Sequence, residues 1–216
     1  MADPTALLRL MTLLSPAFPT GGFAWSGGLE AAIRAGQVSN GHDLAERLRA
    51  SLAFGPLRTE AILVAAAYRG DADANDMALA LAGSASRYAE TTGQGGAFVE
   101  AARPWLDRSG TDAGQPDTVA LSTAIGITAR HLGIPRADTV LAALQSAMSA
   151  QVQAALRLMP LGQEKATALL RSLEADILAA AKATVDATLD ELGTATPMME
   201  FAAMSHDTLD GRMFRS

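Results

Sequence analysis

Apolar residues recur three and four positions apart along most of the chain, and this spacing limits what the chain can fold into. Leu44, Leu48 and Leu52 are one example, and a longer series follows in the second half: Val140, Leu144, Met148, Val152 and Leu156. An α-helix places such residues on one face, whereas a half-buried strand needs a period of two. No segment shows the strand period. The pattern predicts an all-α protein, a single-domain bundle of about eight to ten helices.

Proline, glycine and polar clusters divide this pattern into segments. We expect helices over 7–14, 29–35, 42–54, 59–68, 119–132 and 137–158, the longest helix over 169–192, and a short one after Thr196–Pro197. Residues 77–106 carry two helical stretches, with the break near Gly83–Ser84 or within Gly93–Gly96. Residues 71–76 are predicted as a turn, and 107–117 as a surface loop. The domain spans 1–216, with 1–5 and 211–216 as mobile tails.

Composition excludes several classes of function. Of the 216 residues, 49% are hydrophobic, enough for a sizeable core, and the formal net charge is −6, which argues against nucleic-acid binding. There is no cysteine, so disulfides and thiolate chemistry are excluded, and a reducing compartment fits. The N-terminus lacks the basic start of a signal peptide, and no uncharged run makes a good membrane span. We expect a cytoplasmic protein.

The longest segment without a regular period is Ser15–Glu30. Two prolines fix its backbone, and two glycine pairs, Gly21–Gly22 and Gly27–Gly28, permit conformations closed to other residues. It also carries aromatic residues: Phe18, Phe23 and Trp25. A flexible linker would be polar, so we interpret this segment as a shaped loop anchored on the core that enters a helix near Ser26.

Two patterns resemble hydrolase motifs. Ala24–Gly28 is close to a nucleophile elbow, but that motif needs a strand before the serine, and none is predicted. Ser26 as a helix N-cap explains the same residues. Ser205, His206 and Asp207 are adjacent, and adjacent residues on a helix point in different directions, so they do not form a triad by themselves. A serine hydrolase using Ser26 and His206 remains the enzymatic alternative.

No cofactor or metal site is predicted. The three histidines, at positions 42, 131 and 206, show no paired ligand spacing, and the acidic run Asp71–Asp76 lacks the glycine and glutamate of a calcium loop. We expect the isolated protein to bind a metal ion weakly or not at all. The C-terminus instead presents Met213 and Phe214 between Arg212 and Arg215, a pattern that suits insertion into a partner protein.

Three blocks together resemble the urease accessory protein family UreF. They are Ser15-Pro-Ala-Phe-Pro-Thr-Gly-Gly-Phe23 with Ser26-Gly-Gly-Leu-Glu30, then Ala155-Leu-Arg-Leu-Met-Pro-Leu-Gly-Gln163, and His206-Asp-Thr-Leu-Asp-Gly-Arg-Met-Phe-Arg-Ser216. Their order fits across essentially the whole chain. The sequence departs from the family pattern at Asp207, usually glutamate, and at Asp210, usually aromatic.

The resemblance implies an all-helical chaperone that is not an enzyme and that dimerises. It would bridge the accessory proteins UreD (also called UreH) and UreG on apo-urease and promote nickel insertion, with GTP hydrolysed by UreG. The resemblance also singles out residues for partner binding, and these lie in the loop, the helix junction and the tail, where binding surfaces commonly occur. They are Phe23, Ser26, Glu30, Arg157, His206, Arg212, Met213, Phe214 and Arg215. A helical regulator of an unrelated partner is the other alternative.

Overall fold

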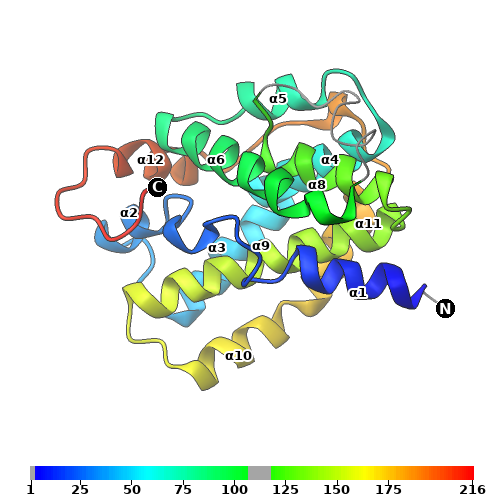
Figure 1. Ribbon diagram of the computed structural model, residues 1–216. Coiled ribbons are helices and arrows are strands. Elements are labelled where there is room, and N and C mark those ends of the chain that lie inside the picture. Colours follow the sequence, from blue (N-terminus) through cyan, green and yellow to red (C-terminus); the bar gives the residue numbers. More distant parts are fainter. Residues whose placement is uncertain (1–2, 107–117) are drawn as a thin grey trace.

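The computed structural model describes residues 3–106 and 118–216, in which every regular element is a helix (Figure 1). The α-helices are α1 (Pro4–Leu13), α2 (Leu29–Arg34), α3 (Gly41–Phe54), α4 (Pro56–Arg69), α5 (Ala74–Ala80), α6 (Ala85–Ala102), α8 (Leu121–His131), α9 (Arg136–Leu158), α10 (Gln163–Ser172), α11 (Glu174–Thr184) and α12 (Pro197–His206). Short 3₁₀ turns cover Gly22–Ala24, Arg103–Trp105 and Leu189–Glu191. The all-α prediction is confirmed, while the loop predicted at 107–117 lies outside the described residues.

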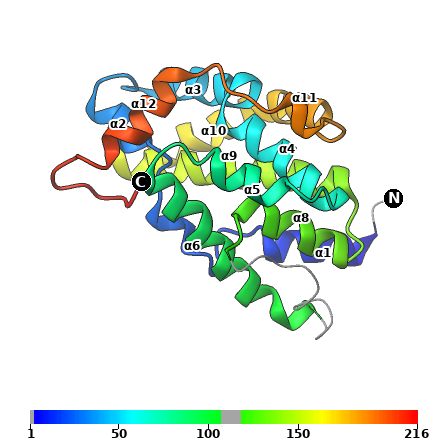
Figure 2. The same cartoon turned by 90° about the horizontal axis from the view of Figure 1, so that it is seen from above.

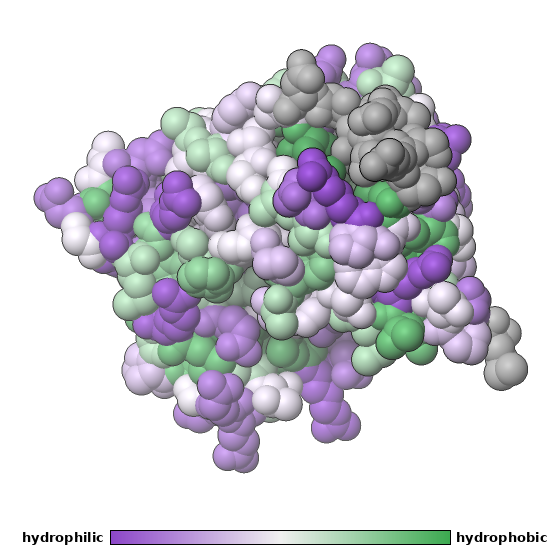
Figure 3. Space-filling model, viewed as in Figure 1, coloured by the Kyte–Doolittle hydropathy of each residue, from purple (hydrophilic) through white to green (hydrophobic). Residues whose placement is uncertain are grey.

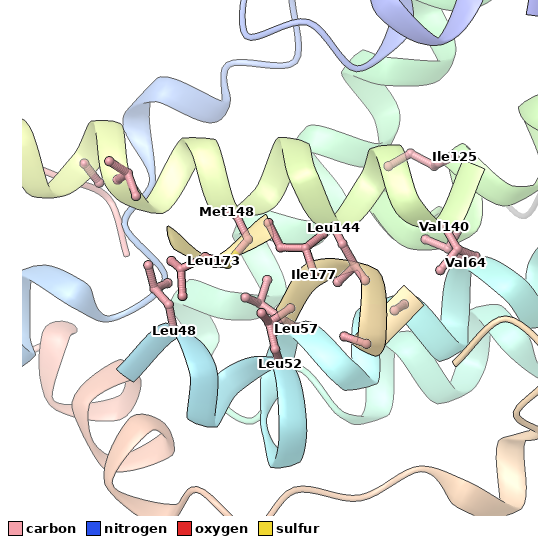
Figure 4. Packing of buried hydrophobic residues seen from close by; sticks show 14 of the residues in the cluster. Leu48, Leu52, Leu57, Val64, Ile125, Val140, Leu144, Met148, Leu173 and Ile177 are labelled. Carbon is pink, nitrogen blue, oxygen red and sulfur yellow. The ribbon is translucent and has the colours of Figure 1, made fainter. Parts of the chain in front are cut away.

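The core is built around α9, the longest described helix, against which α2, α4, α8, α10 and α11 pack. Figure 4 shows α9 crossing above the α3–α4 pair, with leucine, isoleucine, valine and methionine side chains of α3, α4, α9 and α11 meeting between them. In Figure 2, α6, α8 and α1 lie on one side of α9, and α3, α11 and α12 lie on the other. The spacing of four in α9 therefore does place one apolar stripe in the core, at Val140, Leu144, Met148 and Val152.

Most helix boundaries follow the breaks predicted from local chemistry. The side chain of Asn40 accepts hydrogen bonds from the N–H groups of His42 and Asp43 and caps α3. Gly55 and Pro56 separate α3 from α4, since proline has no N–H and favours the first turn of a new helix. Residues 71–76 are a turn only as far as Asp73.

Among the described residues, one span is long and apolar enough by composition to cross a membrane, Gly41–Arg69. The break between α3 and α4 divides it, and 61% of its most apolar window is buried inside the protein. Most of its large apolar side chains belong to the core, although Phe54 is exposed.

The prediction of one continuous helix over 169–192 is wrong. The chain bends at Leu173 between α10 and α11, and α11 ends at Thr184. The hydroxyl of Ser172 donates to the carbonyl of Leu169 at 2.7 Å, and the N–H of Leu173 bonds to the carbonyl of Leu170, so the helical ladder is interrupted there. Leu173 is fully buried at the bend, which lets both helices face the core.

The two break points offered for 77–106 have different outcomes. The chain does leave the helix at Leu81–Ser84, but α6 runs unbroken through Gly93–Gly96. At Gly95 the glycine is required: a Cβ atom there would lie 2.1 Å from the carbonyl oxygen of Val119. The missing side chain allows the segment entering α8 to pass directly against α6.

This contact predicts opposite effects for two glycines of one helix. Gly95→Ala should destabilise the protein by about 1–3 kcal/mol, because the backbone of Val119 must move. Gly93→Ala, with no atom within 4 Å of its added Cβ, should be neutral or stabilise by up to about 1 kcal/mol, since alanine favours helix. Urea unfolding of the two variants measures the difference, and equal stabilities would contradict the assigned role of Gly95.

Within the two segments expected to be mobile tails, the described residues 3–5 and 211–216 make contacts with the rest of the chain. Asp3 accepts a hydrogen bond from the N–H of Thr5 at 3.0 Å, so α1 already begins at Pro4. At the other end, Phe214 and Ser216 are buried. The C-terminal segment returns to the loop between α1 and α2, where Figure 1 shows the red chain end beside the blue helices.

Candidate partner-binding site

The segment between α1 and α2 is a shaped loop fixed to the core, as predicted. The ring of Phe18 packs on that of Phe98 with centroids 5.3 Å apart. From α9, the hydroxyl of Ser146 donates to the carbonyl of Leu14 at 2.9 Å, and the amide of Gln151 donates to the carbonyl of Ser26 at 3.0 Å. Contacts at both ends hold the loop in one conformation.

Gly28 joins this loop to α12. Its φ of +79° lies in the left-handed region, and a Cβ atom on it would sit 2.8 Å from the backbone nitrogen of Ala203. The first turn of α2 and the middle of α12 therefore meet backbone to backbone. This contact sets the position of His206 relative to Glu30.

Glu30 is the centre of the site, with a fully buried side chain. Its carboxylate accepts hydrogen bonds from the N–H of Met213 at 2.9 Å and of Phe214 at 2.9 Å. It also lies 2.7 Å from the guanidinium of Arg34 and 3.2 Å from Nε2 of His206. One carboxylate on α2 thus joins α12 and the C-terminal segment.

These contacts determine the protonation of Glu30. Burial by itself would raise the pKa of its carboxyl group. The backbone N–H groups of Met213 and Phe214, then the hydrogen bond with His206 and the charge of Arg34, outweigh burial, so the pKa lies below its ordinary value. The group is a carboxylate at neutral pH. Nδ1 of His206, by contrast, is buried without a hydrogen-bond partner in the described part of the chain.

Arg34 extends the network to the turn before the tail. Its guanidinium donates to the carbonyls of Asp210 and Gly211 at 2.6 and 2.7 Å, as well as to Glu30. Composition did not single out Arg34, but its position four residues after Glu30 on a helix is a recognisable signal for an ion pair.

Ser26 is not the N-cap of α2, which is Gly28. The N–H and the hydroxyl of Ser26 both donate to the main-chain oxygen of Ser216, and the hydroxyl also accepts weakly from the N–H of Glu30 at 3.3 Å. The predicted cap was wrong because the serine lies two residues before Gly28, at a position where it meets the chain end instead.

The arrangement also removes the hydrolase alternative. The residues before Ser26 form no strand, and its buried hydroxyl is engaged with Ser216. The ring of His206 is buried against the carboxylate of Glu30. Neither residue is presented to a substrate.

Ser26→Ala should therefore have a small effect. The loss of the hydroxyl contact with Ser216 should cost about 1 kcal/mol, the usual net contribution of one hydrogen bond, and the urease maturation that the resemblance implies should remain largely intact. Differential scanning calorimetry and a urease activation assay measure the two quantities. A folded variant without any activity would restore a chemical role for this hydroxyl.

Two arginines stack on aromatic rings beside the network. The guanidinium of Arg157 lies 4.2 Å from the centroid of Phe214 and donates to the carbonyl of Phe23 at 2.5 Å. The guanidinium of Arg215 lies 4.8 Å from the ring centroid of Trp25. Helix α9, through Arg157, and the loop, through Trp25, thereby both contact the C-terminal segment.

The predicted site residues separate into a buried and an exposed set. The buried set holds the C-terminal segment on the rest of the protein and consists of Ser26, Glu30, His206 and Phe214. On the surface the side chain of Phe23 is 79% exposed and that of Met213 56%, with Arg212 and Arg215 exposed nearby in sequence. At the left edge of Figure 3, where Figure 1 places the tail, hydrophilic residues surround small hydrophobic areas. The exposed set lies next to the buried contacts that hold the C-terminal segment.

No group of three histidine, aspartate or glutamate side chains in the described ranges is arranged to hold a metal ion. Sequence reasoning also missed Glu90 on α6, whose carboxylate accepts from the hydroxyl of Ser216 at 2.8 Å. No sequence signal joins two residues that far apart.

The described residues thus form an all-helical domain, with exposed apolar and guanidinium side chains around its C-terminal segment. A family model described as UreF matches residues 38–174, more than half of the chain. The chain belongs to the UreF family of urease accessory proteins and is not an enzyme.

Relatives extend the similarity to nearly the whole chain. The urease accessory protein UreF of Allorhizobium ampelinum is 41% identical over 227 residues, covering 99% of this chain and 98% of the relative. The UreF proteins of Bradyrhizobium diazoefficiens and Agrobacterium fabrum are 39% and 40% identical, covering 99% and 98% of this chain and 93% and 96% of those proteins.

Proposed function

We propose that this urease accessory protein is a chaperone that bridges a UreD-type (UreH) protein and the GTPase UreG on apo-urease and so promotes nickel insertion. The observation that carries the proposal is similarity to UreF relatives over nearly the full length of both chains. Nickel is the cargo of the assembly, and GTP hydrolysis belongs to UreG. The protein would act in the cytoplasm, with which the lack of cysteine agrees, and as a homodimer.

The surface around the C-terminal segment fits such a role. Met213 and Phe23 offer apolar area, and Arg212 and Arg215 offer guanidinium groups that pair with carboxylates. The segment rests on Glu30 and Arg34, so little conformational entropy is lost when a partner binds it. We assign this surface to the UreD-type partner.

The test is co-purification of a UreD-type protein with Arg212→Ala/Met213→Ala. Both side chains are exposed, so the melting temperature should stay unchanged, whereas the complex should weaken about tenfold or more because two interface side chains are lost. The matched control is Arg171→Ala/Leu178→Ala, an arginine and an exposed apolar residue on α10 and α11. Equal binding by both double variants would exclude the tail surface as the contact.

A further inference from the structure

Beside the tail, the interior holds a cavity of about 220 Å³. Residues of α3, α4, α6, α8, α9, α12 and the loop before α2 line it. Much of the wall is apolar, but five charged side chains also reach it: Arg47, Glu60, Arg87, Glu90 and Glu200. A hollow of this size with charged walls holds water.

Three of these charged side chains form a connected network. The guanidinium of Arg87 lies 2.6 Å from the carboxylate of Glu90 and 3.7 Å from that of Glu60. Burial raises the pKa of Glu60, against the opposing charge of Arg87. The strength of both ion pairs depends on how far the cavity is open to solvent, because solvent screens ion pairs.

The last residues of the tail contact three residues of the cavity wall. The hydroxyl of Ser216 donates to Glu90 at 2.8 Å and accepts from the N–H of Gly27 at 3.2 Å. The guanidinium of Arg215 covers the ring of Trp25. Trp25, Gly27 and Glu90 line the cavity, whereas Arg215 and Ser216 do not, so the tail crosses the wall from the outside.

We propose that residues 212–216 form a strap that closes one mouth of the central cavity at Trp25, Gly27 and Glu90, and that Glu30 holds the strap closed. Glu30 holds the N–H groups of Met213 and Phe214, one to two residues before the part that covers the wall. Release at Glu30 frees Arg215 and Ser216 and opens the Arg87–Glu90 pair to solutes. The strap works in the isolated protein, so its test needs no partner.

Two probes report the mouth. In a Trp105→Phe background Trp25 is the sole tryptophan, and its quenching by acrylamide measures how well the strap covers the ring. Since the chain has no cysteine, Ala147→Cys supplies a single thiol on the cavity wall for Ellman's reagent.

Glu30→Gln should raise the rate of thiol labelling about tenfold or more and increase quenching of Trp25, because hydrogen bonds to a charged acceptor are lost. Ser216→Ala removes only the side-chain contacts at the wall and should act in the same direction with a smaller increase. The matched control is Asp210→Asn, the same change of carboxylate to amide on an exposed residue just before the strap, and it should change neither probe.

Hydrogen exchange of the Met213 and Phe214 amides shows independently whether the strap has been released. Fast exchange in Glu30→Gln with unchanged labelling and quenching would overturn the proposal, since a free tail would then not uncover the cavity. Unchanged probes in the folded Ser216→Ala variant, together with an effect of Asp210→Asn, would overturn it as well.

Discussion

Glu30→Ala is expected to cost about 3–5 kcal/mol of unfolding free energy, the range found when one partner of a buried charged network is removed. The substitution leaves His206 and the N–H groups of Met213 and Phe214 buried without their acceptor. Such a loss is a large part of the total stability of a domain, yet the main core around α9 remains. Urea unfolding should show a lower midpoint at a nearly unchanged m-value.

The matched control for this variant is Glu46→Ala. Glu46 pairs with Arg49 at 2.8 Å, but its side chain is 59% exposed, so its removal should cost no more than about 1 kcal/mol. If the two variants lose similar stability, Glu30 is not the centre of the site.

The low pKa of Glu30 also fixes the sign of a pH effect. A carboxyl group whose pKa is lower in the folded than in the unfolded protein stabilises the fold fully above the unfolded value, here about 4.5, and loses that contribution as the pH falls through the folded value. Wild type should therefore lose more stability than Glu30→Ala when both are acidified from pH 6 toward about pH 3.

Gly28→Ala should cost about 3 kcal/mol, the second largest effect. A left-handed backbone conformation costs a residue with a Cβ about 1–2 kcal/mol, and the new atom would lie 2.8 Å from the nitrogen of Ala203, which adds about 1–3 kcal/mol. Because α12 must move away, His206 should separate from Glu30, and the tail should loosen.

Gly21→Ala isolates the contact term. Gly21 has a similar φ of +71°, but no atom lies within 4 Å of the position of its Cβ, so only the conformational cost applies. Melting curves of the two variants should differ by the contribution of the contact with α12. Equal losses would mean that α2 and α12 are not held at backbone distance.

The helices were predictable because local chemistry sets their limits. Asn40, the Gly55–Pro56 pair and the stripe of α9 each act within a few residues of themselves. The errors arose where a distant contact or a side-chain hydrogen bond decided the outcome. Position 95 of α6 is glycine because the chain at Val119 passes against it, and the hydroxyl of Ser172 takes the carbonyl of Leu169 from the helical ladder at the end of α10.

The residues of the site were predicted, but the burial of several of them was not. The blocks around Ser26, Glu30 and His206 were singled out for partner binding, whereas the structure buries them as the base on which the tail lies. No local pattern indicates that backbone N–H groups near the C-terminus donate hydrogen bonds to a carboxylate near the N-terminus. Phe214, taken for an exposed anchor, is held in the core by that same contact.

The position of Glu30 in the chain has a consequence for biosynthesis. The groups that satisfy its carboxylate follow it by 176 residues at His206 and by 183 and 184 residues at Met213 and Phe214. While the ribosome makes the chain from its N-terminus, α2 must wait for nearly all of the remaining sequence before this carboxylate can be buried. Chains released before Phe214 would lack the groups that satisfy the carboxylate of Glu30, so this buried network forms only when synthesis is nearly complete.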